Sequence, residues 1–152
     1  MASWQFDVHV VPRESASEDR IAGPIDDWSA WRGRQPDDHF LEQLGVLLPE
    51  AKSWDDASRT WGQEEGTRVD VSFRDDQIDE VFVRVDLRSP QGKLLEGILS
   101  LARAVDAVFV TPGGQRIEPS VKPFLAAIVD SPAFSFVSNP AAFLKTIGDG
   151  EE

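Results

Sequence analysis

Two stretches of alternating apolar and polar residues give the clearest structural signal in this chain. Apolar side chains occupy every second position of residues 69–73 and of residues 81–87. This period of two is typical of strands with one buried face. Residues 74–77 have the composition of a turn, so we predict a β-hairpin over residues 67–88 with one apolar and one charged face.

The two apolar faces also predict the register of this hairpin. Val69 should lie opposite Val83. Val71 should lie opposite Val81, because a shift by one residue would turn every side chain to the other face. This pairing requires an odd number of loop residues, and a three-residue loop at residues 75–77 meets the requirement.

Alternation predicts further strands on both sides of the hairpin. Residues 4–10 alternate, and this strand should end at Pro12, which cannot donate to a ladder. Residues 107–111 form a short apolar strand that is followed by a Pro-Gly-Gly turn. We expect residues 115–118 to return as its partner strand.

Capping residues predict where helices begin. The pair Ser89–Pro90 begins a helix over roughly residues 90–105, because serine favours the N-cap and proline the first helical position. Its apolar stripe should cover the apolar face of the hairpin. Ser120 begins another helix, and a last helix follows Asn139–Pro140 and ends at Gly148.

The pattern is weak between the first strand and the hairpin. A short helix should follow Asp37 or Asp38 and end at Gly45. Residues 13–35 have no clear period and are expected to form a long loop. At the other end of the chain, residues 149–152 should be a frayed tail.

Together these elements predict an α+β fold, with a mainly antiparallel sheet of about four to five strands and helices packed on one face. The length of 152 residues fits a single domain over residues 1–152. No internal repeat or interdomain linker interrupts it.

Composition narrows the classes of function. The chain has no cysteine, which excludes a disulfide-stapled secreted scaffold and zinc–cysteine sites. No apolar run approaches the ~20 residues of a membrane span, and the N-terminus does not resemble a signal peptide, so we expect a cytoplasmic protein without membrane association. The formal net charge of −12 opposes nucleic-acid binding and favours a basic partner.

Charged residues line up on the polar face of the predicted hairpin. They are Arg68, Asp70, Arg84, Asp86 and Arg88. This array could bind a charged ligand or partner, or it could form the ion pairs of an ordinary solvated sheet face. We favour the second interpretation because such faces are common.

No motif predicts catalysis or a bound metal. A restriction-type nuclease would carry an acidic-x-Lys pattern after an acidic strand residue, but the nearest match, Asp70 with residues 86–88, has arginine in place of lysine. Paired aspartates such as Asp75–Asp76 suit turns better than cation sites. His9 and His39 have no nucleophile motif to act on. We therefore expect no catalytic residue, cofactor or metal.

Tryptophan marks a second candidate interaction surface. Four of the five tryptophans fall between residues 28 and 61, in the more acidic and less periodic half of the chain. Tryptophan and arginine anchor protein interfaces, but tryptophan also pins loops onto a core. Both interpretations stay open for Trp28, Trp31, Arg32, Arg34, Trp54 and Trp61.

A pattern of apolar residues and helix caps extends over roughly residues 54–147. It includes Trp61–Gly62, the strand at 83–88, Leu101–Ala102 and residues 131–144. In this pattern the chain resembles a group of small, mostly uncharacterised bacterial α+β proteins, some of which resemble the immunity partners of bacterial toxins. The resemblance carries over no functional residue.

Two functions follow from these observations. The first is a non-catalytic acidic protein that binds another protein, as an immunity-type inhibitor covers a basic toxin surface. The alternative is an enzyme or small-ligand-binding domain with its site on the charged face of the hairpin. That alternative predicts a concave pocket near Asp70, Arg84 and Asp86.

Overall fold

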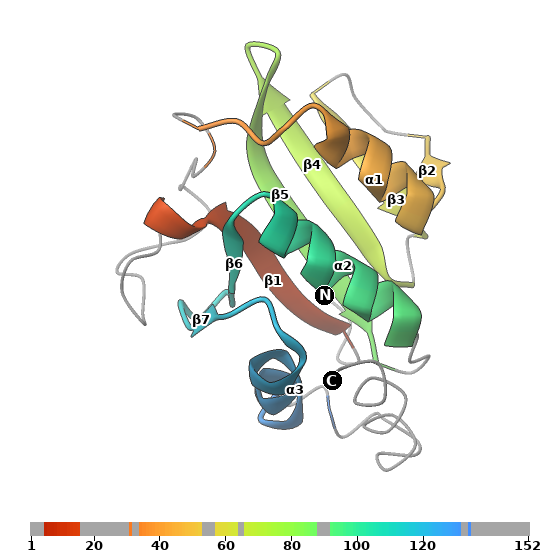
Figure 1. The fold of residues 1–152 in the computed structure, drawn as a ribbon. Helices are drawn as coiled ribbons and strands as arrows, with labels where there is room; N and C mark the ends of the chain where they lie inside the picture. Colours follow the sequence, from red (N-terminus) through yellow and green to blue (C-terminus); the bar gives the residue numbers. More distant parts are fainter. Residues whose placement is uncertain are drawn as a thin grey trace.

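The computed structural model describes residues 5–15, 31, 34–52, 57–63, 66–87, 92–131 and 134. Within these residues, seven strands form one antiparallel sheet in the order β2-β3-β4-β5-β1-β6-β7, and three α-helices accompany it. Figure 1 shows α1 and α2 side by side across the sheet. The α+β prediction is confirmed, and the sheet has more strands than the four to five expected.

The predicted hairpin forms the middle of the sheet. It consists of β4 (Arg68–Arg74) and β5 (Gln77–Asp86). Val69 lies opposite Val83 and Val71 lies opposite Val81, so the predicted register is confirmed.

The loop of the hairpin differs from the prediction. It contains two residues, Asp75 and Asp76, with φ angles of 54° and 63°, which is the geometry of a type I′ turn. The additional residue that the predicted register requires is supplied by a β-bulge next to Phe73. Phe73 lies opposite Ile78, and the next pair along the ladder skips Asp79. The bulge therefore preserves the apolar face that a two-residue turn alone would have reversed.

β1 (Gln5–Pro12) connects the hairpin to the other edge of the sheet. It pairs with β5 on one side and with β6 (Ala107–Val110) on the other. β7 (Arg116–Ile117) then returns beside β6, as predicted. A short 3₁₀ helix at Arg13–Ser15 follows β1.

Two strands at the opposite edge were not predicted. They are β2 (Glu50–Ala51) and β3 (Ser58–Gly62). β3 carries one large apolar residue, Trp61, so its sequence has no alternation to detect. It becomes a strand because β4 offers a free edge next to it, where Trp61 lies opposite Val69. Both outermost strands of the described sheet, β2 and β7, are two residues long, which limits edge-to-edge pairing.

The helices are α1 (His39–Leu47), α2 (Gly92–Ala104) and α3 (Val121–Val129). The prediction that α1 ends at Gly45 is wrong. The helix continues to Leu47, two residues before Pro49, because Leu44 and Leu47 pack against the core. None of these described helices is long and apolar enough to cross a membrane.

Some predicted features lie outside the described residues. They are the start of the second helix at Ser89–Pro90, most of the loop at 13–35, the last helix at 139–148 and the tail at 149–152.

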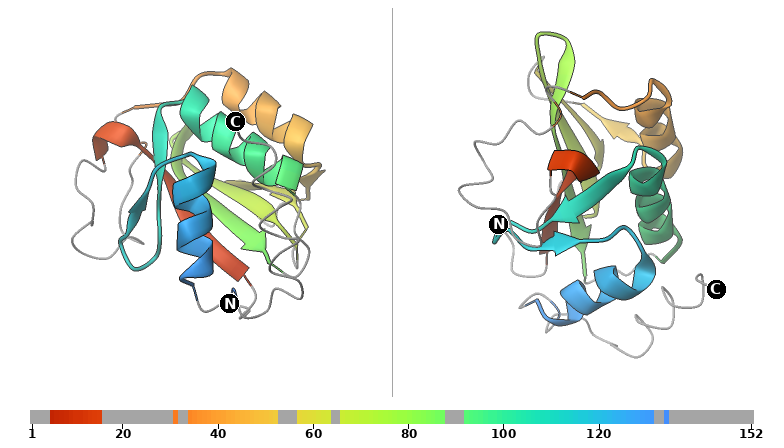
Figure 2. Two further views of the ribbon diagram at one scale, coloured as in Figure 1. Left: turned by 60° about the horizontal axis from the view of Figure 1, so that its bottom comes forward. Right: turned by 60° about the vertical axis from the view of Figure 1, so that its left-hand side comes forward.

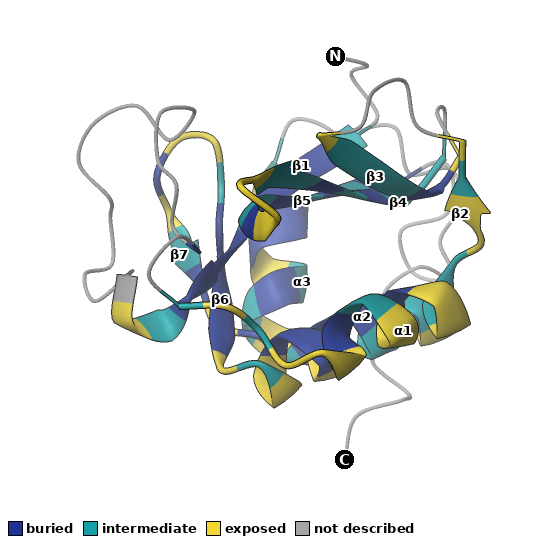
Figure 3. Cartoon of the chain, turned by 90° about the horizontal axis from the view of Figure 1, so that it is seen from above, coloured by how far each residue is buried: buried dark blue, intermediate teal, exposed yellow. Residues whose placement is uncertain are grey.

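The core lies between the sheet and the helices. Figure 3 shows buried residues on the facing sides of the two layers and exposed residues on the outer side of α1. α3 belongs to the same helical layer, because Phe124 contacts Phe6 of β1 and Phe109 of β6 edge to face at 5.7 and 5.1 Å. Figure 2 shows α3 in front of this end of the sheet.

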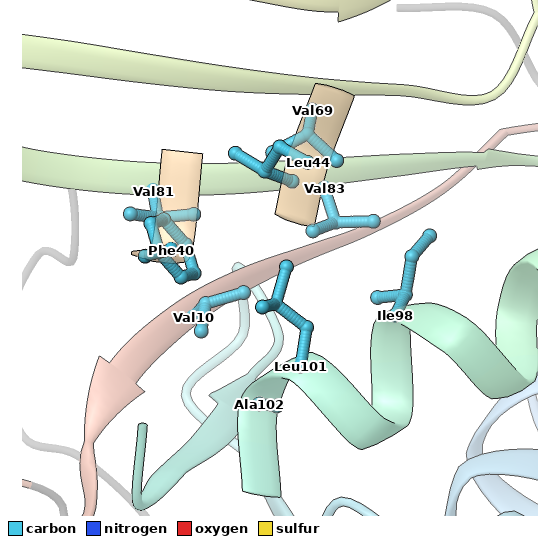
Figure 4. Close-up of a pocket in the computed structure, with 9 residues that line it drawn as sticks. All are labelled: Val10, Phe40, Leu44, Val69, Val81, Val83, Ile98, Leu101 and Ala102. Atoms are coloured by element: carbon cyan, nitrogen blue, oxygen red, sulfur yellow. The ribbon is translucent and has the colours of Figure 1, made fainter. Parts of the chain in front are cut away.

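A small apolar cavity of about 10 Å³ remains in the core. Figure 4 shows Val10 and Val83 of the sheet and Leu101 of α2 pointing toward it, with Phe40 of α1 beside them. This volume is at the lower bound for a single water molecule, and the lining side chains offer no polar partner. The cavity is therefore a packing gap and not a ligand site.

Candidate functional site

The polar face of the sheet turns away from the helices. It collects alternate residues of four neighbouring strands, because side chains two apart on a strand share a face. Arg68 and Asp70 lie on β4, and Arg84 and Asp86 lie on β5, as predicted. Arg88 lies outside the described residues.

Asp7 adds a buried charge to this face. It lies opposite Arg84 in the β1–β5 ladder, and Nε of Arg84 donates a hydrogen bond of 3.0 Å to Oδ1 of Asp7. The Asp7 side chain is 2% exposed and the Arg84 side chain 17% exposed. Oδ2 of Asp7 is also buried and accepts no hydrogen bond from the described residues. This part of the face is therefore not the solvated surface that the sequence suggested.

Asp70 is held by two neighbours on the same face. The hydroxyl of Thr60 donates to Oδ1 of Asp70 at 2.6 Å, and Nε of Arg68 donates to Oδ2 at 3.1 Å. Phe82 lies opposite Asp70 and packs against His9 with a centroid distance of 5.0 Å. The rings of Phe82 and His9 therefore lie between Asp70 and β6 across the sheet.

Asp70 and Asp86 do not converge on one point. Asp70 lies opposite Phe82, four residues before Asp86 along β5. At about 3.3 Å per residue, the two carboxylates are roughly 13 Å apart along the strand. This separation is too large for the two carboxylates of a nuclease metal site.

A hollow lies at the end of this face, beside Asp86. It has a volume of about 280 Å³ and forms where β3, β4 and β5 meet the end of α1. Its walls include Leu48, Pro49, Gly62, Gly66, Thr67 and Asp86. Asp70 and Arg84 do not line it, so the expected pocket near all three residues is reduced to a hollow at one of them.

Comparison with known proteins adds no identity. No protein-family model, no curated protein and no solved structure matches this chain. Its function must therefore be inferred from its own residues.

The tryptophans that the structure describes are buried. Trp31 is 0% exposed and Trp61 is 1% exposed. Nε1 of Trp31 donates a hydrogen bond of 2.7 Å to the carbonyl oxygen of Val10, the last β1 residue that pairs with β5. Trp31 itself is thereby held in the core. Trp28, Arg32 and Trp54 lie outside the described residues.

Arg34, the remaining member of this group that the structure describes, is partly exposed. Its guanidinium nitrogens lie 3.7 Å from carboxylate oxygens of Glu14 and Asp106. Arg13 bonds the same Asp106 and also Glu118, with distances of 3.1 and 2.8 Å. Arg34 therefore belongs to an ion-pair network formed within the chain.

Gln35 makes a contact that the sequence did not indicate. Its amide Nε2 donates to the carbonyl oxygen of Ile78 at 2.9 Å, and its Oε1 accepts from the Ile78 amide at 2.7 Å. This double hydrogen bond fastens the segment before α1 to the hairpin. Gln35 lies in the stretch without periodicity, and no pattern in the sequence could have singled it out.

The Gln35–Ile78 contact brings two exposed acidic pairs toward the same end of the sheet. Asp37 and Asp38 follow Gln35 and Pro36, and Asp75 and Asp76 form the turn just before Gln77 and Ile78. Figure 1 shows the start of α1 and the turn of the hairpin at this end. All four aspartates are exposed, and Arg74 precedes the turn, so this end has an acidic excess.

Several of the other described charges are paired inside the chain. Arg59 binds Glu50 through two hydrogen bonds of 2.8 Å, which lower the pKa of the Glu50 carboxyl. The hydrogen bond from Arg13 likewise lowers the pKa of Glu118. Within the described ranges, no group of three potential ligand residues could hold a metal ion.

Proposed function

We propose that this protein is a non-catalytic binding protein that holds a basic protein partner through its acidic surface, in the manner of an immunity-type inhibitor. One observation carries the proposal: Gln35 and Ile78 gather Asp37, Asp38, Asp75 and Asp76 at one exposed end of the sheet. Carboxylates arranged in this way attract a partner of opposite charge and raise its association rate.

The distribution of arginine supports the same proposal. Six described arginines make ion pairs with carboxylates of the same chain. Their charge is therefore neutralised locally, while the net charge of the chain remains −12. The field that a partner meets is dominated by carboxylates that lack such an arginine.

The test is binding to the protein encoded by the neighbouring gene. The variant Asp37→Asn, Asp38→Asn, Asp75→Asn, Asp76→Asn removes the charges and keeps the side-chain shapes, and asparagine tolerates the positive φ of the turn. We expect its association rate with the partner to fall by about tenfold at low salt and by much less at high salt.

Asp130→Asn is the matched control, since Asp130 is equally exposed but follows α3. It should leave the association rate unchanged. Absence of any complex at low salt, or an equal effect of the control, would refute the proposal.

The alternative function is a small-ligand site on the polar face. Only the hollow beside Asp86 favours it. Asp70 is hydrogen-bonded to Thr60 and Arg68. Arg84 is hydrogen-bonded to Asp7. Binding of a free small molecule by a chain that forms no complex with the neighbouring protein would support this alternative.

A further inference from the structure

The hollow beside Asp86 has the chemistry of a site for one basic side chain. We propose that it binds the charged side chain, ammonium or guanidinium, of a lysine or arginine that the protein partner presents. The source of this side chain rests on the proposed function, whereas the chemistry rests on the hollow itself. Its volume of about 280 Å³ suits a single side chain better than a larger ligand.

Asp86 supplies a negative charge at this hollow. It is the last residue of β5, and the residue is 7% exposed. Its amide nitrogen donates a 3.0 Å hydrogen bond to the hydroxyl of Thr67, which also lines the hollow. A carboxylate has about four acceptor positions, so Asp86 can accept bonds from an incoming cation in addition to its bonds within the chain.

The end of α1 supplies a second negative potential. Leu48 is the C-cap of α1 and lines the hollow together with Pro49. A helix C-terminus carries roughly half a negative charge, and a basic residue in the last turn usually offsets it. The last turn of α1 contains no basic residue. The helix end and Asp86 therefore favour a cation at the same place.

The walls suit an alkyl stem. Leu48 and Pro49 offer apolar surface. Lysine and arginine pack their methylene groups along such a surface while the charged group stays in polar surroundings. Gly62 leaves room at the other side and has a φ of 106°. A Cβ atom there would clash with the carbonyl oxygen of Thr67, so this wall requires glycine.

The experiment is an NMR titration of the full-length ¹⁵N-labelled chain without any partner. The probes are N-acetyl-lysine amide and N-acetyl-arginine amide, and N-acetyl-norleucine amide is the uncharged control of similar shape. We expect both cationic probes to shift the amide signals of Gly62, Gly66 and Thr67, and norleucine amide to leave them in place.

Two variants assign the effect to the hollow. Asp86→Asn removes the charge at constant shape, and Gly66→Leu fills the space, since a Cβ at Gly66 meets only ordinary contacts with Gln63. Each should reduce the shifts at least fivefold. The spectrum of each variant shows whether it is folded, and either folded variant suffices for the test.

Cationic probes that shift none of these signals, or shift them equally in both folded variants, would overturn the inference. That result would leave the proposed function standing if the neighbouring protein still binds. Conversely, probe binding to a chain that forms no complex with the neighbouring protein would support the hollow and refute the protein-binding function.

Discussion

Arg84 donates a 3.0 Å hydrogen bond to Asp7 across the β1–β5 ladder, and the two side chains are buried to different extents. The Asp7 side chain is 2% exposed, whereas the Arg84 side chain is 17% exposed and lies 5.5 Å from the centre of the Phe82 ring. A charge that loses its partner is costly in proportion to its burial. Removing either member of this pair should therefore have unequal effects.

Arg84→Met should lower the free energy of unfolding by about 3–5 kcal/mol, because it leaves the carboxylate of Asp7 buried without its cation. Asp7→Asn should cost about 1 kcal/mol less, because Arg84 can turn its guanidinium toward water. Urea denaturation at pH 7 measures both. The double variant should be more stable than Arg84→Met alone, and equal losses in the two single variants would contradict the interpretation.

Asp76→Gly should stabilise the hairpin. Asp76 has a φ of 63°, a conformation that costs an L-residue roughly 1 kcal/mol and costs glycine almost nothing. After the greater entropy of glycine in the unfolded chain is counted, we expect a gain of about 0.5 kcal/mol, visible as a higher urea midpoint. Gln77→Gly is the control, because Gln77 has no positive φ and should lose stability.

Val83→Ile should fill the small core cavity. Val83 lines a gap of about 10 Å³, and burying one extra methylene there contributes up to about 0.8 kcal/mol. Val71→Ile is the matched control on the same face, since Val71 is fully buried but does not line the cavity. It should lose about 1 kcal/mol or more through overpacking. A gain in both variants would show that the core is loosely packed throughout.

His39 should titrate above its ordinary pKa of 6.5. The hydrogen bond of its ring with Glu42 at 2.9 Å raises the pKa, and the charge of Asp37 adds to the shift. Because the pKa is raised in the folded state, the interaction stabilises the protein below pH 6.5 and is lost as the pH rises through the folded value.

NMR titration of His39 checks this directly. Glu42→Gln should bring the pKa of His39 back toward 6.5. The stability difference between the wild-type chain and His39→Gln should be largest in mildly acidic solution. A His39 pKa that does not respond to Glu42→Gln would contradict the geometry.

The polar face shows where sequence reasoning succeeded and where it could not. Alternation placed Arg68, Asp70, Arg84 and Asp86 on one face, because the period of a strand is a local property. It could not show that Asp7 joins them as a buried ion pair. Asp7 and Arg84 are separated by 77 residues, and only the pairing of β1 with β5 brings them together.

The segment between β1 and β4 gave the weakest predictions for the same reason. β3 lacks alternation, α1 continues beyond Gly45, and Gln35 acts through a backbone 43 residues away. Each of these features depends on the neighbour that the segment meets. Local propensity therefore carries little information about them.

The sequence by itself determined the α+β class, the register of Val69 with Val83, the strand that ends at Pro12 and the acidic charge. These follow from periodicity, from proline geometry and from composition, all of which are local or additive. The tertiary structure alone decided the bulge at Asp79, the burial of Asp7, the gathered aspartates and the hollow at Asp86. Those features arise from contacts between distant parts of the chain, where a side chain's burial and partners depend on the strands and helices placed beside it.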